Sequence, residues 1–268
     1  MTIESTLSEL AIDIAREAGE LARRRRDEGV RIAATKSGLA DIVTEADREV
    51  EALIRARVDA ERPGDGFLGE ESGAGESTTG VTWVVDPIDG TVNYAYGIPA
   101  YAVSIGVVQG TPDPREWTAL AGVVHNPATG ELFHAARGAG AFLGERPIAV
   151  NAAPDASGAL IATGFGYDPE KRTRQLAVLG KMMPIARDIR RMGAASLDLT
   201  AVAAGRVDAY YESGLWPWDQ AAGALIVEEA GGIVGALDGE RASRDLLIAA
   251  APGFWPAFTQ ALADALAS

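Results

Sequence analysis

The sequence of 268 residues predicts an α+β first half, residues 1–150, packed against an α/β second half, residues 151–268. Three observations predict this fold class. Hydrophobic residues make up 47% of the chain and charged residues 23%, which is typical of a globular protein with a substantial core. In the first half, two helical patterns precede a series of short strand-like segments. In the second half, strand-like and helical segments alternate, as they do in α/β folds.

The first half begins with two amphipathic helices. Apolar residues recur at helical spacing near the N-terminus and predict an opening helix whose apolar face comprises Leu7, Leu10, Ile14, Ala18 and Leu21. A second helix is expected over residues 44–60, before Pro63. Strand-like runs follow at residues 81–85, 101–108, 120–125 and 131–135, with a hairpin over 138–148. Residues 73–80, rich in Gly, Ser and Thr, are expected to form a loop.

The second half has a different order of elements. Strands are expected at residues 160–163, 207–211 and 246–250, and helices at 173–183, 194–204, 220–230 and 255–267. Two histidines, His125 and His134, fall on predicted strands without acidic neighbours at metal-ligand spacing. We therefore interpret both as surface or packing residues rather than catalytic ones.

Charge and composition exclude several classes of function. The chain has 24 Lys and Arg against 38 Asp and Glu, a net charge of −14, so nucleic acid is not expected as the main ligand. An anionic ligand would instead require a cation between it and the protein. The absence of cysteine excludes disulfides, zinc–thiolate sites and a cysteine nucleophile. The basic run Arg23 to Arg26 is interpreted as a solvated helix end, with a patch for nucleic acid or another anionic partner as the alternative.

Location follows from the absence of targeting signals. The N-terminus lacks the basic start and apolar run of a secretory signal, and no stretch approaches 18 uninterrupted apolar residues. We therefore expect a cytoplasmic protein without a membrane span.

The sharpest motif follows the predicted strand at residues 81–85. It reads Asp86-Pro-Ile-Asp89-Gly90-Thr91. Two carboxylates at the end of a strand, with the Ile88 carbonyl between them, offer the oxygen ligands that Mg²⁺ prefers. Gly90 allows a ligand to approach the backbone closely, and free N–H groups at a helix start would favour an anion. The alternatives are a turn that only caps a helix, and an aspartyl-phosphate phosphatase loop, whose two aspartates are separated by two positions rather than three.

Further carboxylates occur in three other short segments. Glu70-Glu71 follows an apolar approach that ends in glycine, Asp41 and Asp47 lie on either side of Val43-Thr44, and Asp219 follows Trp218 at a predicted helix start. Each of these segments is a weak signal alone.

Together, these motifs resemble the inositol monophosphatase family. Their order and spacing match over about residues 10–250, and the segments at 93–106 and 208–212 look most like bacterial inositol-1-monophosphatases. The resemblance implies a layered αβαβα sandwich of the inositol monophosphatase and fructose-bisphosphatase type. It also implies a homodimer.

The resemblance implies two to three Mg²⁺ ions in each active site, with Li⁺ as an inhibitor. Glu70, Asp86 and the Ile88 carbonyl would hold the first ion. Asp86, Asp89 and Asp219 would hold the second, and Glu70 with water would hold a weaker third. Carboxylates about 4 Å apart repel by roughly 4 kcal/mol at an effective dielectric of about 20, so such a cluster requires cations.

The reaction implied by the resemblance is direct attack of a metal-activated water on a phosphate monoester. Asp47 and Thr91 would orient this water and receive its proton, with Glu70 beside them. The phosphate would lie on the N–H groups of Gly90 and Thr91. Three further residues would surround the ligands and order water: Lys36, Asp41 and Glu71.

The residues implied to meet the substrate hydroxyls are Asp89, Gly193, Ala195, Glu212 and Asp219. Glu212 is the position that the resemblance links most closely to inositol, so myo-inositol 1-phosphate is the expected substrate. Histidinol phosphate and fructose 1,6-bisphosphate are the alternatives within the family. A regulatory, partner-binding protein without turnover is the alternative from another class.

Overall fold

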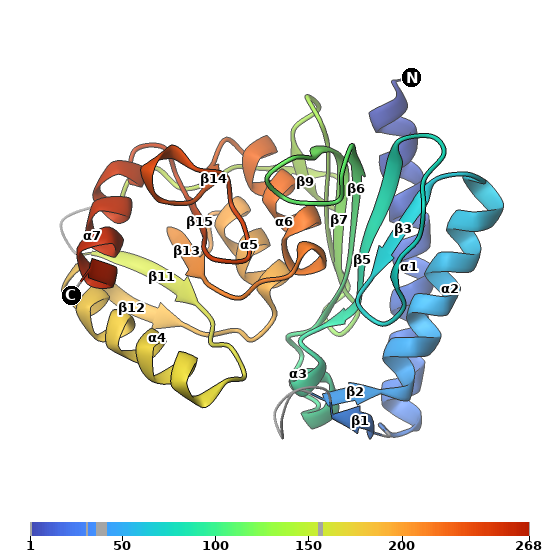
Figure 1. Ribbon diagram of the computed structural model, residues 1–268, viewed down its shortest axis with the longest axis horizontal. Helices are drawn as coiled ribbons and strands as arrows, with labels where there is room; N and C mark the ends of the chain where they lie inside the picture. Colours follow the sequence, from blue (N-terminus) through green and yellow to red (C-terminus); the bar gives the residue numbers. More distant parts are fainter. Residues whose placement is uncertain (1, 31, 36–41, 155–157, 268) are drawn as a thin grey trace.

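The structure is a computed structural model that describes residues 2–30, 32–35, 42–154 and 158–267. Its elements form five layers, in the order helices, sheet, helices, sheet, helices (Figure 1). This arrangement confirms the predicted αβαβα sandwich. The large sheet ends at Ile148 and the small sheet begins at Ala159. Whether residues 1–150 and 151–268 act as separate units stays a prediction.

Helices α1 (Ile3–Glu28) and α2 (Glu45–Glu61) form the first layer. The Thr2 side chain caps α1 by accepting the Ser5 N–H at 3.3 Å. Thr44 caps α2 in a capping box with Asp47. The apolar sides of both helices pack on one face of the large sheet in a core that includes Ile14. Both predicted helices are therefore confirmed.

The second layer is an eight-stranded sheet in the order β10-β9-β8-β7-β6-β5-β3-β4. Only the β3–β5 pair among its described strands is parallel. Every residue of β5 is buried, because helices cover both faces of the sheet. The strands are β3 (Gly66–Gly69), β4 (Gly73–Ala74), β5 (Val81–Asp89), β6 (Ala102–Gln109), β7 (Thr118–Asn126), β8 (Glu131–Ala136), β9 (Ala141–Leu143) and β10 (Arg146–Ile148).

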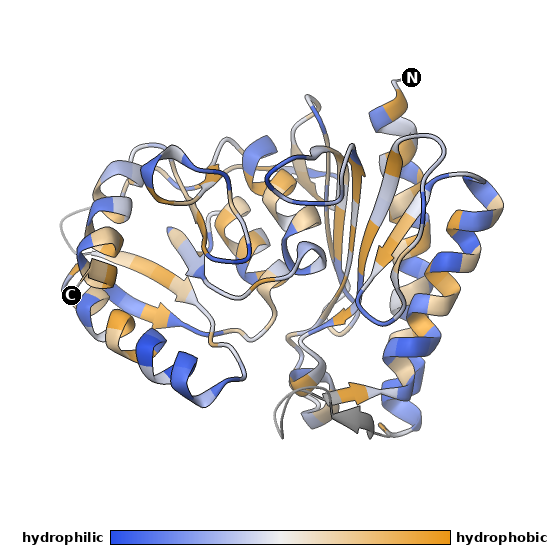
Figure 2. Cartoon of the chain, in the orientation of Figure 1, coloured by the Kyte–Doolittle hydropathy of each residue, from blue (hydrophilic) through white to orange (hydrophobic). Residues whose placement is uncertain are grey.

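Helices α5 (Ala195–Ala203) and α6 (Pro217–Glu229) form the middle layer between the two sheets. All nine residues of α5 are buried, so this helix has no solvent-exposed polar side. Figure 2 shows hydrophobic residues along the strands of the large sheet and a mixture of both kinds along the outer helices.

The fourth layer is a five-stranded sheet in the order β12-β11-β13-β15-β14. Strand β11 is parallel to both of its neighbours, and β15 is antiparallel to both of its own. Helices α4 (Pro169–Met182) and α7 (Trp255–Ala267) cover its outer face. The strands are β11 (Ala159–Thr163), β12 (Ala186–Arg190), β13 (Ala209–Glu212), β14 (Ile233–Gly235) and β15 (Leu247–Ala250).

The remaining elements are short. Strands β1 (Ile32–Thr35) and β2 (Ile42–Thr44) form an antiparallel pair, and α3 (Thr91–Tyr96) follows β5. Two 3-10 turns, η1 and η2, cover Met183–Ile185 and Leu237–Gly239.

Several predicted boundaries were wrong. The strand expected to end at Val85 continues to Asp89, and Gly73–Ala74 of the expected loop pairs with β3. Helix α4 begins at Pro169 rather than Thr173, because Asp168 caps it by accepting the Lys171 N–H.

The basic run at the end of α1 forms ion pairs. Arg25 contacts Glu28 and Glu49, each at 2.6 Å, and Arg23 lies 3.7 Å from Asp27. These exposed contacts support its interpretation as a solvated helix end. Within the described ranges, no helix is long and apolar enough to cross a membrane.

Candidate functional site

Three carboxylates from two parts of the chain converge between the sheets. Asp86 and Asp89 come from the end of β5, and Asp219 is the third residue of α6. Each offers an oxygen, and these oxygens all lie within 4.8 Å of one another. Such a spacing allows one cation to contact all three side chains.

An irregularity in β5 makes this convergence possible. In a regular strand, residues three positions apart point to opposite faces of the sheet. Between Asp86 and Asp89, however, the pairing shifts: Asp86 faces Ser104 of β6, whereas Asp89 faces Ala102. Strand β5 therefore carries one extra residue there, as in a β-bulge, and both carboxylates reach the same site. The Ile88 N–H donates to Asp86 Oδ1 at 3.0 Å within this bulge.

Backbone groups from the second half hold two of the carboxylates. Asp89 accepts the N–H groups of Ala195 (3.2 Å) and Ser196 (2.7 Å), and also the Ser196 hydroxyl, all from the first turn of α5. Asp219 accepts the Trp216 N–H at 2.7 Å. Ala195, expected to meet substrate, thus uses its N–H to position Asp89.

The electrostatics of this cluster favour a cation. Burial, and then the charge of Glu70, raise the pKa of Asp86 well above its usual value. Burial and the Asp89 charge do the same to the pKa of Asp219. Burial also raises the pKa of Asp89, although the Ser196 hydrogen bonds oppose this rise. A buried set of oxygen donors that repel one another fits a hard divalent cation such as Mg²⁺.

Asp47 and Thr91 meet beside this cluster. The Thr91 hydroxyl lies 3.3 Å from Asp47 Oδ1 and 3.1 Å from the Ile88 carbonyl oxygen. The Thr44 N–H and hydroxyl both donate to the other oxygen of Asp47. Burial raises the pKa of Asp47 to about 7, against the effect of these Thr44 hydrogen bonds. The carboxyl can therefore exchange a proton near neutral pH.

Gly90 connects the end of β5 to α3. Its φ of 87° lies in the left-handed region, which favours glycine. A Cβ at this position would lie 2.9 Å from the Ala100 oxygen and 3.2 Å from the Gly193 oxygen. The backbones of Gly90 and Gly193 are therefore close together.

Of the four other acidic or basic residues predicted around the cluster, the structure describes Glu70 and Glu71. The Glu70 N–H donates to the Val85 oxygen at 3.2 Å, which places Glu70 beside β5. The Glu71 N–H donates to Glu51 Oε2 at 2.8 Å. Glu51 is buried, and no signal in the sequence separated it from the other charges of α2. Lys36 and Asp41 lie outside the described residues.

Glu212 lies at the end of β13 with two buried neighbours. Tyr210 donates its hydroxyl to Glu212 at 2.6 Å, and burial raises the pKa of Glu212 to about 7. Asp198 of α5 is also buried, and burial followed by the Glu212 charge raises its pKa well above the usual value. We did not predict a role for Asp198, although an acidic residue within an apolar helix is a recognisable signal.

Both histidines contact backbone carbonyls. His125 Nδ1 lies 3.1 Å from the Glu131 oxygen, and His134 Nε2 lies 2.9 Å from the Gly144 oxygen. His134 also stacks on Phe142. These contacts fit the packing role inferred from the sequence.

Comparison with known proteins agrees with the geometry. The model of the inositol monophosphatase family matches residues 4–268. The inositol-1-monophosphatase SuhB of Mycobacterium tuberculosis is 44% identical over 92% of this chain and 90% of its own. The Nus factor SuhB of Escherichia coli is 40% identical over 84% of this chain and 83% of its own. The crystal structure of the extragenic suppressor protein suhB from Bartonella henselae superposes with a TM-score of 0.87 at 36% identity, covering 96% of this chain and 98% of that one.

Proposed function

The chain belongs to the inositol monophosphatase family, and from this premise we propose that it is a Mg²⁺-dependent phosphatase of small polyol phosphate monoesters, acting on myo-inositol 1-phosphate. The observation that carries the proposal is the convergence of Asp86, Asp89 and Asp219 on one point. The Mycobacterium relative supports the choice of substrate, because it is named an inositol-1-monophosphatase.

The proposed metal ligands are those that the resemblance to the family implies. Glu70, Asp86 and the Ile88 carbonyl would hold one Mg²⁺; Asp86, Asp89 and Asp219 would hold a second, and Glu70 would contribute to a third. Bound Mg²⁺ supplies positive charge that neutralises the carboxylates and polarises both the phosphate and water. Burial and the charge of Glu70, which raise the pKa of Asp86, support this assignment.

Asp47 and Thr91 are proposed to handle the proton of the attacking water. The Thr91 hydroxyl, within hydrogen-bonding distance of Asp47 Oδ1, would orient the water, and the Asp47 carboxylate would accept the proton. A pKa of about 7 for Asp47 suits a group that takes and releases a proton near neutral pH. Glu70 would help to orient the same water.

The remaining residues are proposed to bind the ester. The phosphate would lie on the backbone N–H groups of Gly90 and Thr91. Asp89, Asp219, Glu212 and Gly193 would face the polyol hydroxyls, while Ala195 would act through Asp89. The Glu71 N–H donates to Glu51, and this contact would help to fix the position of the neighbouring Glu70.

Phosphate release tests this function. Inositol 1-phosphate, histidinol phosphate and fructose 1,6-bisphosphate are compared with and without Mg²⁺. We expect release only with Mg²⁺, and a kcat/KM for inositol 1-phosphate at least about tenfold above the others, which corresponds to about 1.4 kcal/mol. A higher value for another ester would overturn the substrate and retain the chemistry. Absence of release from all three would overturn the proposed function.

A partner-binding function is the second candidate. The Escherichia coli relative is named a Nus factor, which points to a role other than turnover in that protein. Asp89→Asn distinguishes the candidates here, because it removes a metal ligand at nearly constant size. Phosphate release that persists unchanged in this variant would argue against the phosphatase assignment. We also propose a homodimer and inhibition by Li⁺, which sedimentation and a Li⁺ titration of the activity would test.

A further inference from the structure

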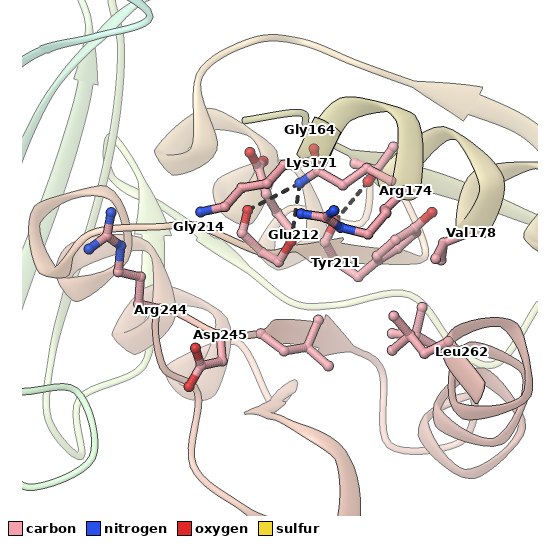
Figure 3. Close-up of a pocket in the computed structure, with 15 residues that line it drawn as sticks. Gly164, Lys171, Arg174, Val178, Tyr211, Glu212, Gly214, Arg244, Asp245 and Leu262 are labelled. Carbon is pink, nitrogen blue, oxygen red and sulfur yellow. Dashed lines mark hydrogen bonds between the residues drawn. The ribbon is translucent and has the colours of Figure 1, made fainter. Parts of the chain in front are cut away.

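Gly164 lies beside Glu212 at one end of the small sheet. Strands β11 and β13 are parallel neighbours, and their register pairs Thr163 with Tyr211. The Thr163 hydroxyl also donates to the Tyr211 oxygen at 2.9 Å, which ties the two strand ends together. The next residues along the chain, Gly164 and Glu212, therefore stand opposite each other, and side chains at two such positions compete for the same space. Figure 3 shows both residues in the lining of a cavity of about 550 Å³.

The absence of a side chain at Gly164 leaves this space to the carboxyl group of Glu212. The three atoms nearest to a Cβ added at position 164 all belong to Glu212, and the added atom would overlap its Cδ and both of its carboxylate oxygens. One of these oxygens, Oε2, accepts the hydroxyl hydrogen bond of Tyr210 at 2.6 Å. A side chain at position 164 would therefore displace the carboxyl group from its place beside Tyr210.

The backbone after β11 is held to α4, so it cannot easily move away from Glu212. The Gly166 N–H donates to Gln175 Oε1 at 3.0 Å, and the Arg172 side chain donates to the Gly166 oxygen at 2.7 Å. The Glu212 carboxyl group, in contrast, is the far end of a flexible side chain. An alanine in place of Gly164 would therefore move Glu212 rather than the backbone.

We propose that Gly164 is a specificity-determining position of the polyol site, because the lack of a side chain there allows Glu212 to face the hydroxyls of the substrate alcohol. The inference rests on the proposed function, in which Glu212 binds those hydroxyls. Glu212 lies close to the carboxylate cluster, since its charge contributes to the raised pKa of Asp219. Esters whose alcohol carries several hydroxyls should depend on position 164, whereas the chemistry at the phosphate should not.

Gly164→Ala and Gly166→Ala form a matched pair of variants. They make the same change two positions apart, neither glycine has a positive φ, and an added Cβ at Gly166 would have only one Gln175 atom near it, at 3.9 Å. We expect Gly164→Ala to lower kcat/KM for inositol 1-phosphate about tenfold, mainly through KM, because the contacts with Glu212 are lost. The value for 4-nitrophenyl phosphate, whose leaving group carries no further hydroxyl, should stay within about twofold. Gly166→Ala should leave both values within about twofold.

A double-mutant cycle with Glu212→Ala distinguishes an action through Glu212 from an effect on the fold. Glu212→Ala removes the three atoms that a Cβ at position 164 would overlap. In that background, Gly164→Ala should therefore change neither Tm nor kcat/KM any further. In the wild-type background it should keep Tm within about 3 °C, because only a flexible side chain has to move. Losses that multiply in the double variant, or a fall in Tm that Glu212→Ala does not relieve, would overturn the inference.

A failure of the proposed function gives a different result. If wild type cleaves neither ester, or if Glu212→Ala keeps the preference for inositol 1-phosphate over 4-nitrophenyl phosphate, Glu212 does not bind a substrate polyol, and the inference about Gly164 is wrong as well. If Glu212→Ala loses this preference and Gly164→Ala keeps it, only the inference about Gly164 is wrong.

Discussion

The Glu212 carboxylate is buried in a way that disfavours its charge. Burial is the main cause that raises its pKa to about 7, and Asp89 adds to this effect. The Tyr210 hydrogen bond and the charge of Arg191 oppose it. The protonated side chain can donate to a polyol oxygen and the ionised one can accept from a hydroxyl, so both forms could bind substrate.

This pKa predicts how stability depends on pH. The folded protein binds the Glu212 proton more tightly than the unfolded chain, whose carboxyl has the usual pKa of 4.5. The free energy of unfolding therefore falls as the pH rises from about 4.5 to about 7. Glu212→Gln lacks this group, so its stability relative to wild type should rise by about 2 to 3 kcal/mol between pH 5 and pH 8.

Urea unfolding of both proteins with EDTA at the two pH values measures this difference. Asp47 and Asp86 titrate in both proteins and cancel in the comparison, whereas the Glu212 charge also raises the pKa of Asp198 and Asp219, so their titration contributes to the measured difference. Glu9→Gln, which removes a carboxylate from α1, is the control, and it should leave the pH dependence of stability unchanged. A constant difference between Glu212→Gln and wild type across the two pH values would contradict the assigned pKa.

At the scale of single elements, the turn after β5 combines a bulge with a glycine that has little space around it. Gly90 has a positive φ, and an added Cβ would contact the Ala100 and Gly193 oxygens closely. Gly138, in the β8–β9 hairpin, also has a positive φ of 76°, but no atom lies within 4 Å of an added Cβ. The two positions therefore separate backbone strain from crowding.

Gly138→Ala should destabilise the protein by about 1 kcal/mol, the cost of a left-handed conformation. Gly90→Ala should cost about 2 kcal/mol or more, because the neighbouring backbone must also shift, and it should reduce phosphatase activity at least about tenfold. Chemical denaturation and initial rates at saturating Mg²⁺ measure both effects. Equal destabilisation by the two variants would show that space around Gly90 is not limiting.

Helices and strands with a buried side or a fully buried run were predicted from the sequence, and exposed ones were not. Amphipathic α1 and the hydrophobic run of β5 were found from sequence, because one-sided or complete burial leaves a clear pattern. The edge strand β12, with the sequence Ala-Arg-Asp-Ile-Arg, was not predicted, because a largely exposed strand needs no apolar pattern. The bulge in β5 was also missed, since it depends on pairing with β6.

The carboxylates of the site could be predicted from the sequence, but the groups that hold them could not. The motifs supplied Asp86, Asp89 and Asp219, and the structure brings their oxygens within 4.8 Å of one another. Their supports carry no motif: Ser196 holds Asp89 from a segment far away in the sequence, and the Trp216 N–H holds Asp219 at the start of α6. The contact of Ser196 becomes visible only when the position of α5 beside the end of β5 is known.

At the scale of the whole molecule, the carboxylate cluster joins the two halves of the chain. Asp86 and Asp89 belong to the large sheet, whereas Asp219 belongs to the middle layer of helices. Neutral contacts join the same two halves: the Asn93 amide donates to the Met192 oxygen at 2.8 Å, and the Ser104 hydroxyl donates to the Trp218 oxygen at 3.3 Å. Without metal, mutual repulsion of the carboxylates opposes these contacts.

Mg²⁺ should therefore stabilise the whole molecule. At a Mg²⁺ concentration about 100 times its dissociation constant, binding to the folded state alone adds about 2.7 kcal/mol, which raises Tm by about 5 °C or more. Asp219→Asn should have a higher Tm than wild type in EDTA, because one repelling charge is gone. It should gain much less from Mg²⁺, because one ligand is gone as well.

Thermal unfolding of both proteins, with EDTA and across a Mg²⁺ titration at pH 7.5, tests this pair of opposite effects. Asp245→Asn, an exposed substitution outside the carboxylate cluster, controls for the change in net charge and should behave as wild type does. Equal gains from Mg²⁺ in wild type and Asp219→Asn would place the stabilising ion elsewhere. A lower Tm of Asp219→Asn in EDTA would mean that its hydrogen bond from Trp216 outweighs the repulsion, so the cluster would be held together by the fold rather than by metal.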